Sequence, residues 1–372
     1  MNKNVYFQNS KEEIYNNVFP FFKSIKEANY KKLNNTDKKI MDQILDQIKK
    51  TNNFPFKLNS QELLFLQKNS KDKWMDYLIY RYKFRTFPQE KIVSDFPLYV
   101  LLEPVSTCNL RCTMCFQIDK TFTKKPFMGI MNMDFFKNII DDCYKNGTKA
   151  ITLASRGEPT LHPKLGEMLE YASGKFYELK LNTNATRLND KLIHSILSSG
   201  VNELVYSVDE SEKDKFEKLR VHANFDDVVK NIIKFKEIRD KYYKDSKTTT
   251  RISGVLVNED QDVKKITNFW EQYVDHVVFV KCQNRWDTYN NNPDNEISPC
   301  NYLWERMYIW FDGIANPCDV DYKSYLKLGK LDYSNNSIRD LWHSNEFKNI
   351  RKKHLNKQRD SFNPCDRCGL TF

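Results

Sequence analysis

Seven of the nine cysteines in this chain fall into two spaced groups. The first group is compact, with Cys108, Cys112 and Cys115 in the run CNLRCTMC. Three thiolates in one short loop can ligate three irons of a cubane cluster and leave the fourth iron open to a small molecule. A catalytic zinc ion also leaves one position open, although zinc sites rarely combine this spacing with a loop that directly follows a strand. The pattern therefore favours an iron–sulfur cluster.

The second group is spread over the last part of the sequence and consists of Cys300, Cys318, Cys365 and Cys368. Four thiolates can close either a zinc site or a [4Fe–4S] cluster, and the residue types alone do not separate the two. A cluster whose irons are all held by protein has no position for a substrate. Its natural role is electron transfer.

The elements that must position the first group alternate between strands and helices. Short apolar runs typical of buried strands occur at 98–104, 150–154, 178–182, 203–208, 252–257 and 276–282. Amphipathic helices are expected between them, including 132–147, about 190–199 and about 225–243. This alternation predicts an α/β fold with a parallel sheet and right-handed crossovers. Ligands should lie at the carboxyl ends of the strands.

The flanking segments have different patterns. The first part predicts helices, one capped by Thr36 and a second carrying Leu63, Leu64 and Leu66, followed by an aromatic stretch from Trp74 to Phe87. After the strand pattern stops, the sequence predicts a hairpin at 326–331 and a helix at 337–354. We therefore predict three parts: a helical N-terminal cover over 1–95, an α/β core over 96–290 and a small α+β domain over 291–372. A partner-binding role for the N-terminal part is the alternative.

Composition excludes several classes of protein. Hydrophobic residues make up 40% and aromatic residues 14%, which is enough for a sizeable core and disfavours global disorder. No run approaches the ~18 apolar residues of a membrane helix, and the N-terminus lacks the apolar core of a secretory signal. We expect a cytoplasmic protein without a membrane partner. The net charge of +10 is scattered along the chain, which disfavours a nucleic-acid partner.

The run CNLRCTMC resembles the CxxxCxφC signature of the radical S-adenosylmethionine (SAM) superfamily. It lies where that family carries it, after the first strand of a partial (β/α)6 TIM-like barrel. The resemblance implies that a [4Fe–4S] cluster on Cys108, Cys112 and Cys115 binds the amino and carboxylate groups of SAM. It also implies reductive cleavage of SAM to a 5′-deoxyadenosyl radical, which removes hydrogen from a substrate. A reductant such as flavodoxin or ferredoxin is then an expected partner.

Residues after the later strands agree with this resemblance. The run Ser155-Arg156-Gly157-Glu158-Pro159 is similar to the family's GGE motif, with Arg156 in place of the first glycine. By the resemblance, Glu158 accepts from the SAM amino group. Arg220 resembles an arginine that pairs with the methionyl carboxylate. The other SAM contacts implied are Met114, Gly157, Asn184, Ser207 and Asp209.

The last segment resembles the twitch and SPASM auxiliary-cluster domains, so the expected cofactors are SAM and two [4Fe–4S] clusters. Full SPASM domains carry further cysteines for two clusters. The four here, Cys300, Cys318, Cys365 and Cys368, imply the one-cluster twitch form. Their spacing is similar to that of the butirosin-pathway dehydrogenase, a family member that oxidises an alcohol of an aminocyclitol.

We therefore expect a radical SAM oxidoreductase that dehydrogenates a small sugar-like, cyclitol-like or nucleotide-linked alcohol. Gln283 and Arg285 follow the last predicted strand as candidate catalytic residues, with Arg285 orienting a substrate oxygen or receiving its proton. A solvated loop is the alternative for both. Two other functions stay open: a peptide or protein maturase with an N-terminal leader-binding module, and a zinc-stabilised nucleic-acid-binding protein.

Overall fold

The computed structural model describes residues 3–282, 287–293 and 296–370. The chain divides into two compact units, Met1–Val93 and Ser94–Phe372. None of the helices in the described residues has the length and apolar character needed to span a bilayer.

The N-terminal unit is helical, as its sequence predicts. Asn34, and not the expected Thr36, caps its second long helix, because the Asn34 side chain accepts from Asp37 N at 2.9 Å. The buried carboxylate of Glu62 bridges two helices by binding Arg81 and Arg85 at 2.5 and 2.7 Å. The long helices of this unit are α1 (Lys3–Ser24), α2 (Asn35–Thr51), α3 (Ser60–Lys68) and α4 (Trp74–Glu90).

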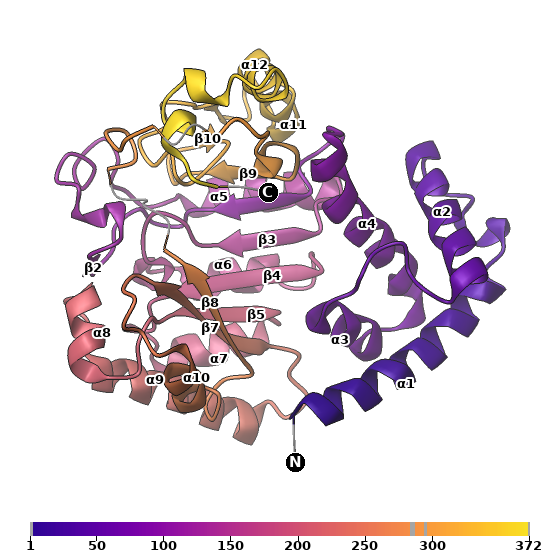
Figure 1. The fold of residues 1–372 in the computed structure, drawn as a ribbon, viewed down its shortest axis with the longest axis horizontal. Coiled ribbons are helices and arrows are strands. Elements are labelled where there is room, and N and C mark those ends of the chain that lie inside the picture. The colour runs from indigo at the N-terminus through magenta and orange to yellow at the C-terminus, as the bar shows by residue number, and fades with distance from the viewer. Residues whose placement is uncertain (1–2, 283–286, 294–295, 371–372) are drawn as a thin grey trace. The chain divides into compact units, whose positions relative to one another are not determined.

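The second unit contains the parallel sheet that the sequence predicts (Figure 1). The strands that the sequence predicts in it are β1 (Tyr99–Leu102), β3 (Ala150–Leu153), β4 (Glu178–Thr183), β5 (Glu203–Ser207), β7 (Thr249–Leu256) and β8 (His276–Lys281), parallel and adjacent in that order. Every residue of β3 is buried, as expected for a strand covered on both faces. The predicted α/β class and parallel arrangement are confirmed.

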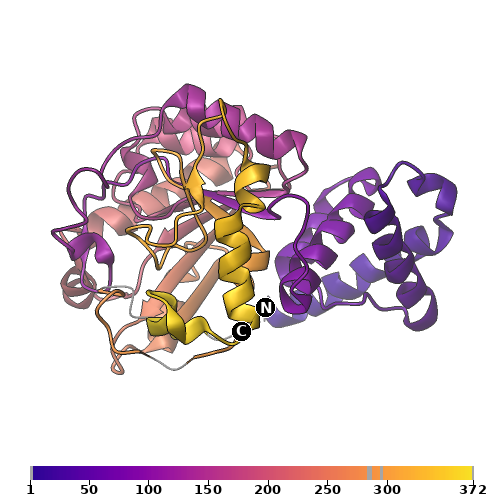
Figure 2. The same cartoon turned by 90° about the horizontal axis from the view of Figure 1, so that it is seen from above.

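Helices connect the strands and lie along one side of the sheet (Figure 2). Asn132 caps the first of them by accepting from Asp134 N and Phe135 N, and Gly147 at φ +86° follows its end. The predicted ranges therefore match three of these helices closely. The connecting helices are α5 (Met133–Lys145), α6 (Leu165–Ala172), α7 (Asp190–Ser198), α8 (Lys213–Leu219), α9 (Phe225–Tyr242) and α10 (Val263–Trp270).

The C-terminal segment extends the same sheet beyond β1. Strand β9 (Arg306–Ile309) pairs in parallel with β1, and β10 (Ile314–Asn316) pairs antiparallel with β9. The hairpin therefore lies earlier than predicted, turning at Gly313, while the range 326–331 contains one short strand, β11 (Gly329–Lys330).

The single helix predicted at 337–354 is two helices. The first is α11 (Ile338–Trp342) and the second is α12 (Asn345–Leu355). They are separate because the Ser344 side chain accepts from Phe347 N at 3.2 Å and starts a new helix there.

Candidate functional site

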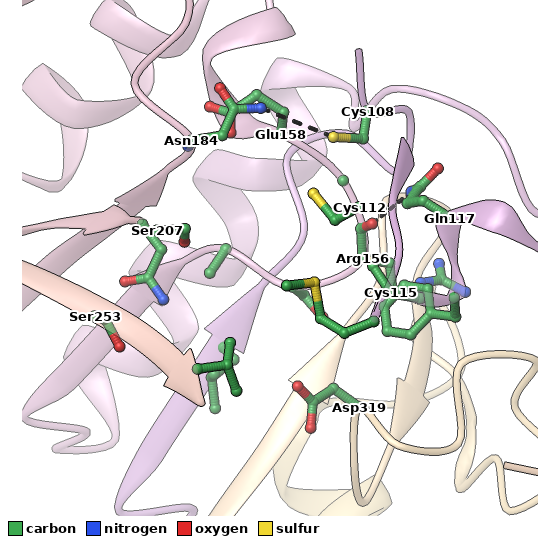
Figure 3. Close-up of a pocket in the computed structure, with 18 of the residues that line it drawn as sticks. Cys108, Cys112, Cys115, Gln117, Arg156, Glu158, Asn184, Ser207, Ser253 and Asp319 are labelled. Atoms are coloured by element: carbon green, nitrogen blue, oxygen red, sulfur yellow. Dashed lines mark hydrogen bonds between the residues drawn. The ribbon is translucent and has the colours of Figure 1, made fainter. Parts of the chain in front are cut away.

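A cavity of about 590 Å³ lies at the carboxyl ends of the parallel strands, where the sequence places ligands. Its size suits a small-molecule site. The thiols of Cys108 and Cys112 and the carboxylate of Asp319 face this space (Figure 3). The predicted site residues that line it are Cys108, Cys112, Met114, Cys115, Gly157, Glu158, Asn184, Ser207 and Arg220.

Two short strands fix Cys112 beside Arg220. Strand β2 (Arg111–Cys112) pairs antiparallel with β6 (Arg220–Val221), and Arg220 Nη1 donates to Cys112 Sγ at 3.9 Å. Asp209 is fully buried and accepts from Arg220 Nε at 2.7 Å and Nη2 at 3.1 Å. Burial opposes the charge of Arg220, but Asp209 and the neighbouring cysteines together raise its pKa. Asp209 therefore orients Arg220 from behind the cavity.

The cysteine sulfurs have donors directed at them. Leu110 N donates to Cys108 Sγ at 3.4 Å, and Asn184 Nδ2 donates to the same sulfur at 3.9 Å. Burial raises the pKa of Cys108 to about 12, so this thiol needs a bound cation to lose its proton at neutral pH. Donors to sulfur stabilise cluster-bound thiolates. The donor set therefore fits an iron–sulfur cluster.

The three thiols of the first group lie in one neighbourhood. Cys112 and Cys115 both act electrostatically on Cys108, so the three lie near one another. Within the described part of the chain, however, no three His, Cys, Asp or Glu side chains converge closely enough to hold a single metal ion. A zinc ion draws its thiolates to about 2.3 Å from one point. The three thiols lie near one another without forming a closed site for one ion in the described residues.

Glu158 joins the ends of two neighbouring strands. Its Oε1 accepts from the hydroxyls of Thr160 and Thr183, each at 2.7 Å, and its Oε2 accepts from Asn184 N at 2.7 Å. Burial raises the pKa of Glu158, and these hydrogen bonds act against that rise. A carboxylate oxygen can accept more than one hydrogen bond, so Oε2 can also accept one from a bound ligand. Gly157 is required here, because a Cβ would lie 2.2 Å from the Val105 carbonyl oxygen.

Two buried polar atoms in cavity-lining residues lack a partner. Ser155 has φ +106°, a strained conformation for a residue other than glycine, and its Oγ makes no hydrogen bond. Gln117 donates from Nε2 to the carbonyl oxygens of Ser106 and Arg156, at 2.8 and 2.5 Å, which leaves Oε1 without a donor. An acceptor and a hydroxyl without partners beside the cysteines fit a polar cofactor such as SAM.

Arg156, which replaces a glycine in the motif, is fixed below the cavity. It binds Glu103, and its Nη1 donates to the Tyr322 carbonyl oxygen at 2.9 Å. Its guanidinium lies 4.2 Å from the ring centre of Trp310. This arginine therefore connects the loop after β3 to the C-terminal segment.

The second group of cysteines is also gathered in space. Cys318 and Cys365 each interact electrostatically with Cys300 and Cys368, and burial raises the pKa of both thiols. Val320 N donates to Cys318 Sγ at 3.2 Å. The four predicted ligands thus lie near one another, with a donor directed at one sulfur.

Direct contacts connect the two cysteine groups. Phe116, next to Cys115, stacks on Tyr322 with ring centres 4.7 Å apart and planes 16° apart. Tyr322 Oη donates to Asp119 at 2.9 Å, and Lys323 Nζ binds the same carboxylate at 2.7 Å. Burial raises the pKa of Asp119, but these two partners help to lower it overall.

Several cavity-lining residues were not predicted. Asp319 is one of them. It directly follows Cys318, an expected cluster ligand, and this neighbouring carboxylate could have identified it from the sequence. Tyr302, Arg306 and Tyr308 reach the cavity because β9 lies beside β1. The predicted catalytic residues, Gln283 and Arg285, lie outside the described residues.

Comparisons with known proteins agree with this geometry. A family model for the radical SAM superfamily matches residues 102–269, and one for the SPASM iron–sulfur cluster-binding domain matches residues 300–369. The tungsten-containing aldehyde ferredoxin oxidoreductase cofactor-modifying protein of Pyrococcus furiosus is 35% identical over 112 residues, which are 30% of each chain. The chain spans less than two thirds of the length of this and the next two curated relatives that it matches.

Solved structures with the same fold include two of interest here. BtrN, solved in complex with AdoMet and 2-DOIA, matches with a TM-score of 0.51 at 17% identity, over 73% of this chain and 93% of BtrN. Streptococcus suis SuiB, bound to its precursor peptide SuiA, matches with a TM-score of 0.56 at 16% identity, over 85% of this chain and 78% of SuiB. Both likenesses concern the fold.

Proposed function

We propose that this chain, which belongs to the radical SAM superfamily and carries a SPASM iron–sulfur cluster-binding domain, is an oxidoreductase that dehydrogenates a small polar alcohol. The two domains imply SAM and two [4Fe–4S] clusters as cofactors. The observation that best supports the proposal is that Asp319, next to Cys318, lines the same cavity as the first three cysteines. A substrate in this cavity lies against both cluster domains, as a net oxidation requires.

In this proposal, the first three cysteines hold one cluster and the four later cysteines hold the other. When bound, the first cluster with SAM would supply the radical chemistry for removing a hydrogen atom, and the second cluster would supply an electron acceptor. The protein orients SAM. Glu158 Oε2 provides an acceptor for its ammonium, and Arg220, held by Asp209, provides donors for its carboxylate.

The oxidation also releases a proton. The carbon–hydrogen bond of the alcohol loses its hydrogen atom to the radical, the hydroxyl loses its proton to a base, and loss of one electron completes the carbonyl. Asp319 is the proposed base, because its half-buried carboxylate faces the cavity beside Cys318. Arg285 and Gln283 remain predictions for orienting the substrate.

The rest of the cavity suits a hydroxylated substrate. Tyr302, Arg306 and Tyr308 line it from the C-terminal segment, and Tyr99 and Lys281 line it from strands β1 and β8. Phenol and guanidinium groups hydrogen-bond to hydroxyl oxygens while their apolar parts contact a carbon ring. We propose a sugar-like or cyclitol-like alcohol as the substrate, a flavodoxin or ferredoxin as the reductant and a cytoplasmic location.

A peptide maturase is the second candidate function. The SuiB structure with its precursor peptide and curated relatives named mycofactocin maturase favour it. In that case the cavity would accept the side chain of a peptide residue.

The test is anaerobic incubation of the reconstituted enzyme with SAM and dithionite, separately with aminocyclitols, aminosugars and peptides. Formation of 5′-deoxyadenosine together with a carbonyl product from an aminocyclitol or aminosugar is the expected result. Substrate-dependent 5′-deoxyadenosine with the peptides alone would replace the dehydrogenase with the maturase.

A further inference from the structure

A buried arginine joins the segments that carry the second group of cysteines. Arg359 is 1% exposed. Its Nη1 donates to the carbonyl oxygens of Leu370 at 2.8 Å and Ser298 at 3.2 Å, and its Nη2 donates to the carbonyl oxygen of Cys368. These three carbonyls each lie within two residues of Cys300 or Cys368. Arg359 therefore fixes two of the proposed cluster ligands relative to each other.

The charge of Arg359 acts on the cysteines electrostatically. Its guanidinium lies within electrostatic reach of Cys300 and Cys365. Glu296 also lies within electrostatic reach, but no Asp or Glu in the described segments forms an ion pair with Arg359. A buried cation normally has an anionic partner. The four thiolates of a bound cluster would be that partner.

One donor of Arg359 also lacks an acceptor. Its Nε–H is buried and makes no hydrogen bond to any residue that the structure describes. A buried donor without a partner costs about 1–3 kcal/mol, so an acceptor brought by a bound group would be favourable at this position. Cluster and thiolate sulfurs accept hydrogen bonds and carry negative charge. A cluster on the four cysteines would satisfy both the charge and the free donor.

We propose that Arg359 sets the reduction potential of the second iron–sulfur cluster and keeps it high enough to accept an electron from the substrate radical. A cluster held by four thiolates is anionic and becomes more negative on reduction, so a buried positive charge beside it stabilises the reduced state. Arginine suits this role because it stays protonated. The role of this potential in accepting an electron from substrate rests on the proposed dehydrogenase function. The effect of Arg359 on the potential does not. Arg359 is a positioning residue, because it acts through the cluster.

Arg351 is the matched control. It is also buried, at 4% exposed, and donates to the carbonyl oxygens of Leu303 and Trp342 at 2.8 and 2.9 Å. Its guanidinium lies 3.7 Å from the ring centre of Phe347 and 4.3 Å from that of Trp342. Burial alone lowers the pKa of Arg351 to about 9, as expected for a site away from anionic groups. Replacing it removes a buried arginine from the same domain without removing charge beside the cysteines.

The experiment is a redox titration of the reconstituted full-length enzyme, followed by electron paramagnetic resonance without substrate. The signal that does not change on adding SAM reports the second cluster. In Arg359→Gln and Arg359→Met, the reduced-to-oxidised ratio at the wild-type midpoint should fall at least tenfold, which is about 59 mV for a one-electron couple. Arg359→Lys should shift less than these neutral variants, and Arg351→Met should keep the wild-type midpoint.

A wild-type midpoint in either neutral variant at full iron content would overturn the proposal. The proposal would also be overturned if both neutral variants lost the second cluster while Arg351→Met retained it. Arg359 would then be needed to hold the cysteine segments together, not to set the potential. Since no substrate is used, either result leaves the dehydrogenase proposal standing. Conversely, a shifted midpoint in an enzyme that oxidises no alcohol would separate the tuning from the proposed function.

Discussion

Arg156 and Glu103 form a bidentate ion pair closed to solvent, with an Nε–Oε2 distance of 2.6 Å and an Nη2–Oε1 distance of 2.5 Å. Glu103 directly follows β1, and Arg156 lies in the loop after β3. The same arginine donates to the Tyr322 carbonyl oxygen. The pair therefore connects the SAM-binding core to the auxiliary-cluster domain in a place where the motif of the family has glycine.

Removing the arginine of this pair should destabilise the second unit. In Arg156→Met, Glu103 is left as a buried carboxylate without a counter-charge, which costs about 3–5 kcal/mol. Urea unfolding followed by circular dichroism measures this, with exposed Arg187→Met as the control. The double variant Arg156→Met/Glu103→Gln should recover part of the loss. A double variant no more stable than Arg156→Met would contradict the pairing.

Glu158→Gln should weaken SAM binding while the iron content stays at the wild-type value. The neutral amide loses the charge-assisted interaction with the SAM ammonium, so the dissociation constant should rise about 10- to 100-fold, or about 1.5–3 kcal/mol. Anaerobic equilibrium dialysis with labelled SAM measures it. Glu170→Gln, on the exposed side of α6, is the control and should bind as wild type. An unchanged constant in Glu158→Gln would remove this carboxylate from the SAM site.

Asp319→Asn should separate SAM cleavage from product formation. An asparagine keeps the shape of the side chain but cannot take the hydroxyl proton, so the rate of carbonyl formation should fall about 100-fold or more. The yield of 5′-deoxyadenosine per carbonyl product, measured by liquid chromatography, should rise accordingly. Asp360→Asn, an exposed carboxylate of the same domain, should match the wild type. Equal product rates in Asp319→Asn and the wild type would exclude Asp319 as the base.

The parallel sheet was predictable because its strands are short apolar runs with helices between them. The C-terminal hairpin was placed too late because β9 and β10 are short, and the turn at Gly313 was the available signal. Capping residues such as Asn132 and Ser344 set helix ends locally. The cap at Asn132 was predictable. The cap at Ser344 was not, because the spacing of apolar residues across it is that of one continuous helix.

The site was predictable only in part because side-chain direction depends on distant contacts. Asp209 follows a strand as predicted, but it lies behind Arg220 and does not line the cavity. Asp319 reaches the cavity because β9 pairs with β1, a contact between residues about 200 positions apart. No local pattern encodes that approach. The proximity of Phe116 and Tyr322 arises in the same way.

The most direct test of the central claim uses the double variant Cys365→Ala/Cys368→Ala and an alcohol, oxidised by the wild type, that carries deuterium at the reacting carbon. Iron should fall from about eight to about four per chain, and SAM binding and circular dichroism check that the core is intact. The account predicts that deuterium still enters 5′-deoxyadenosine while the carbonyl product no longer accumulates. Carbonyl formation at the wild-type rate with about four irons would contradict it.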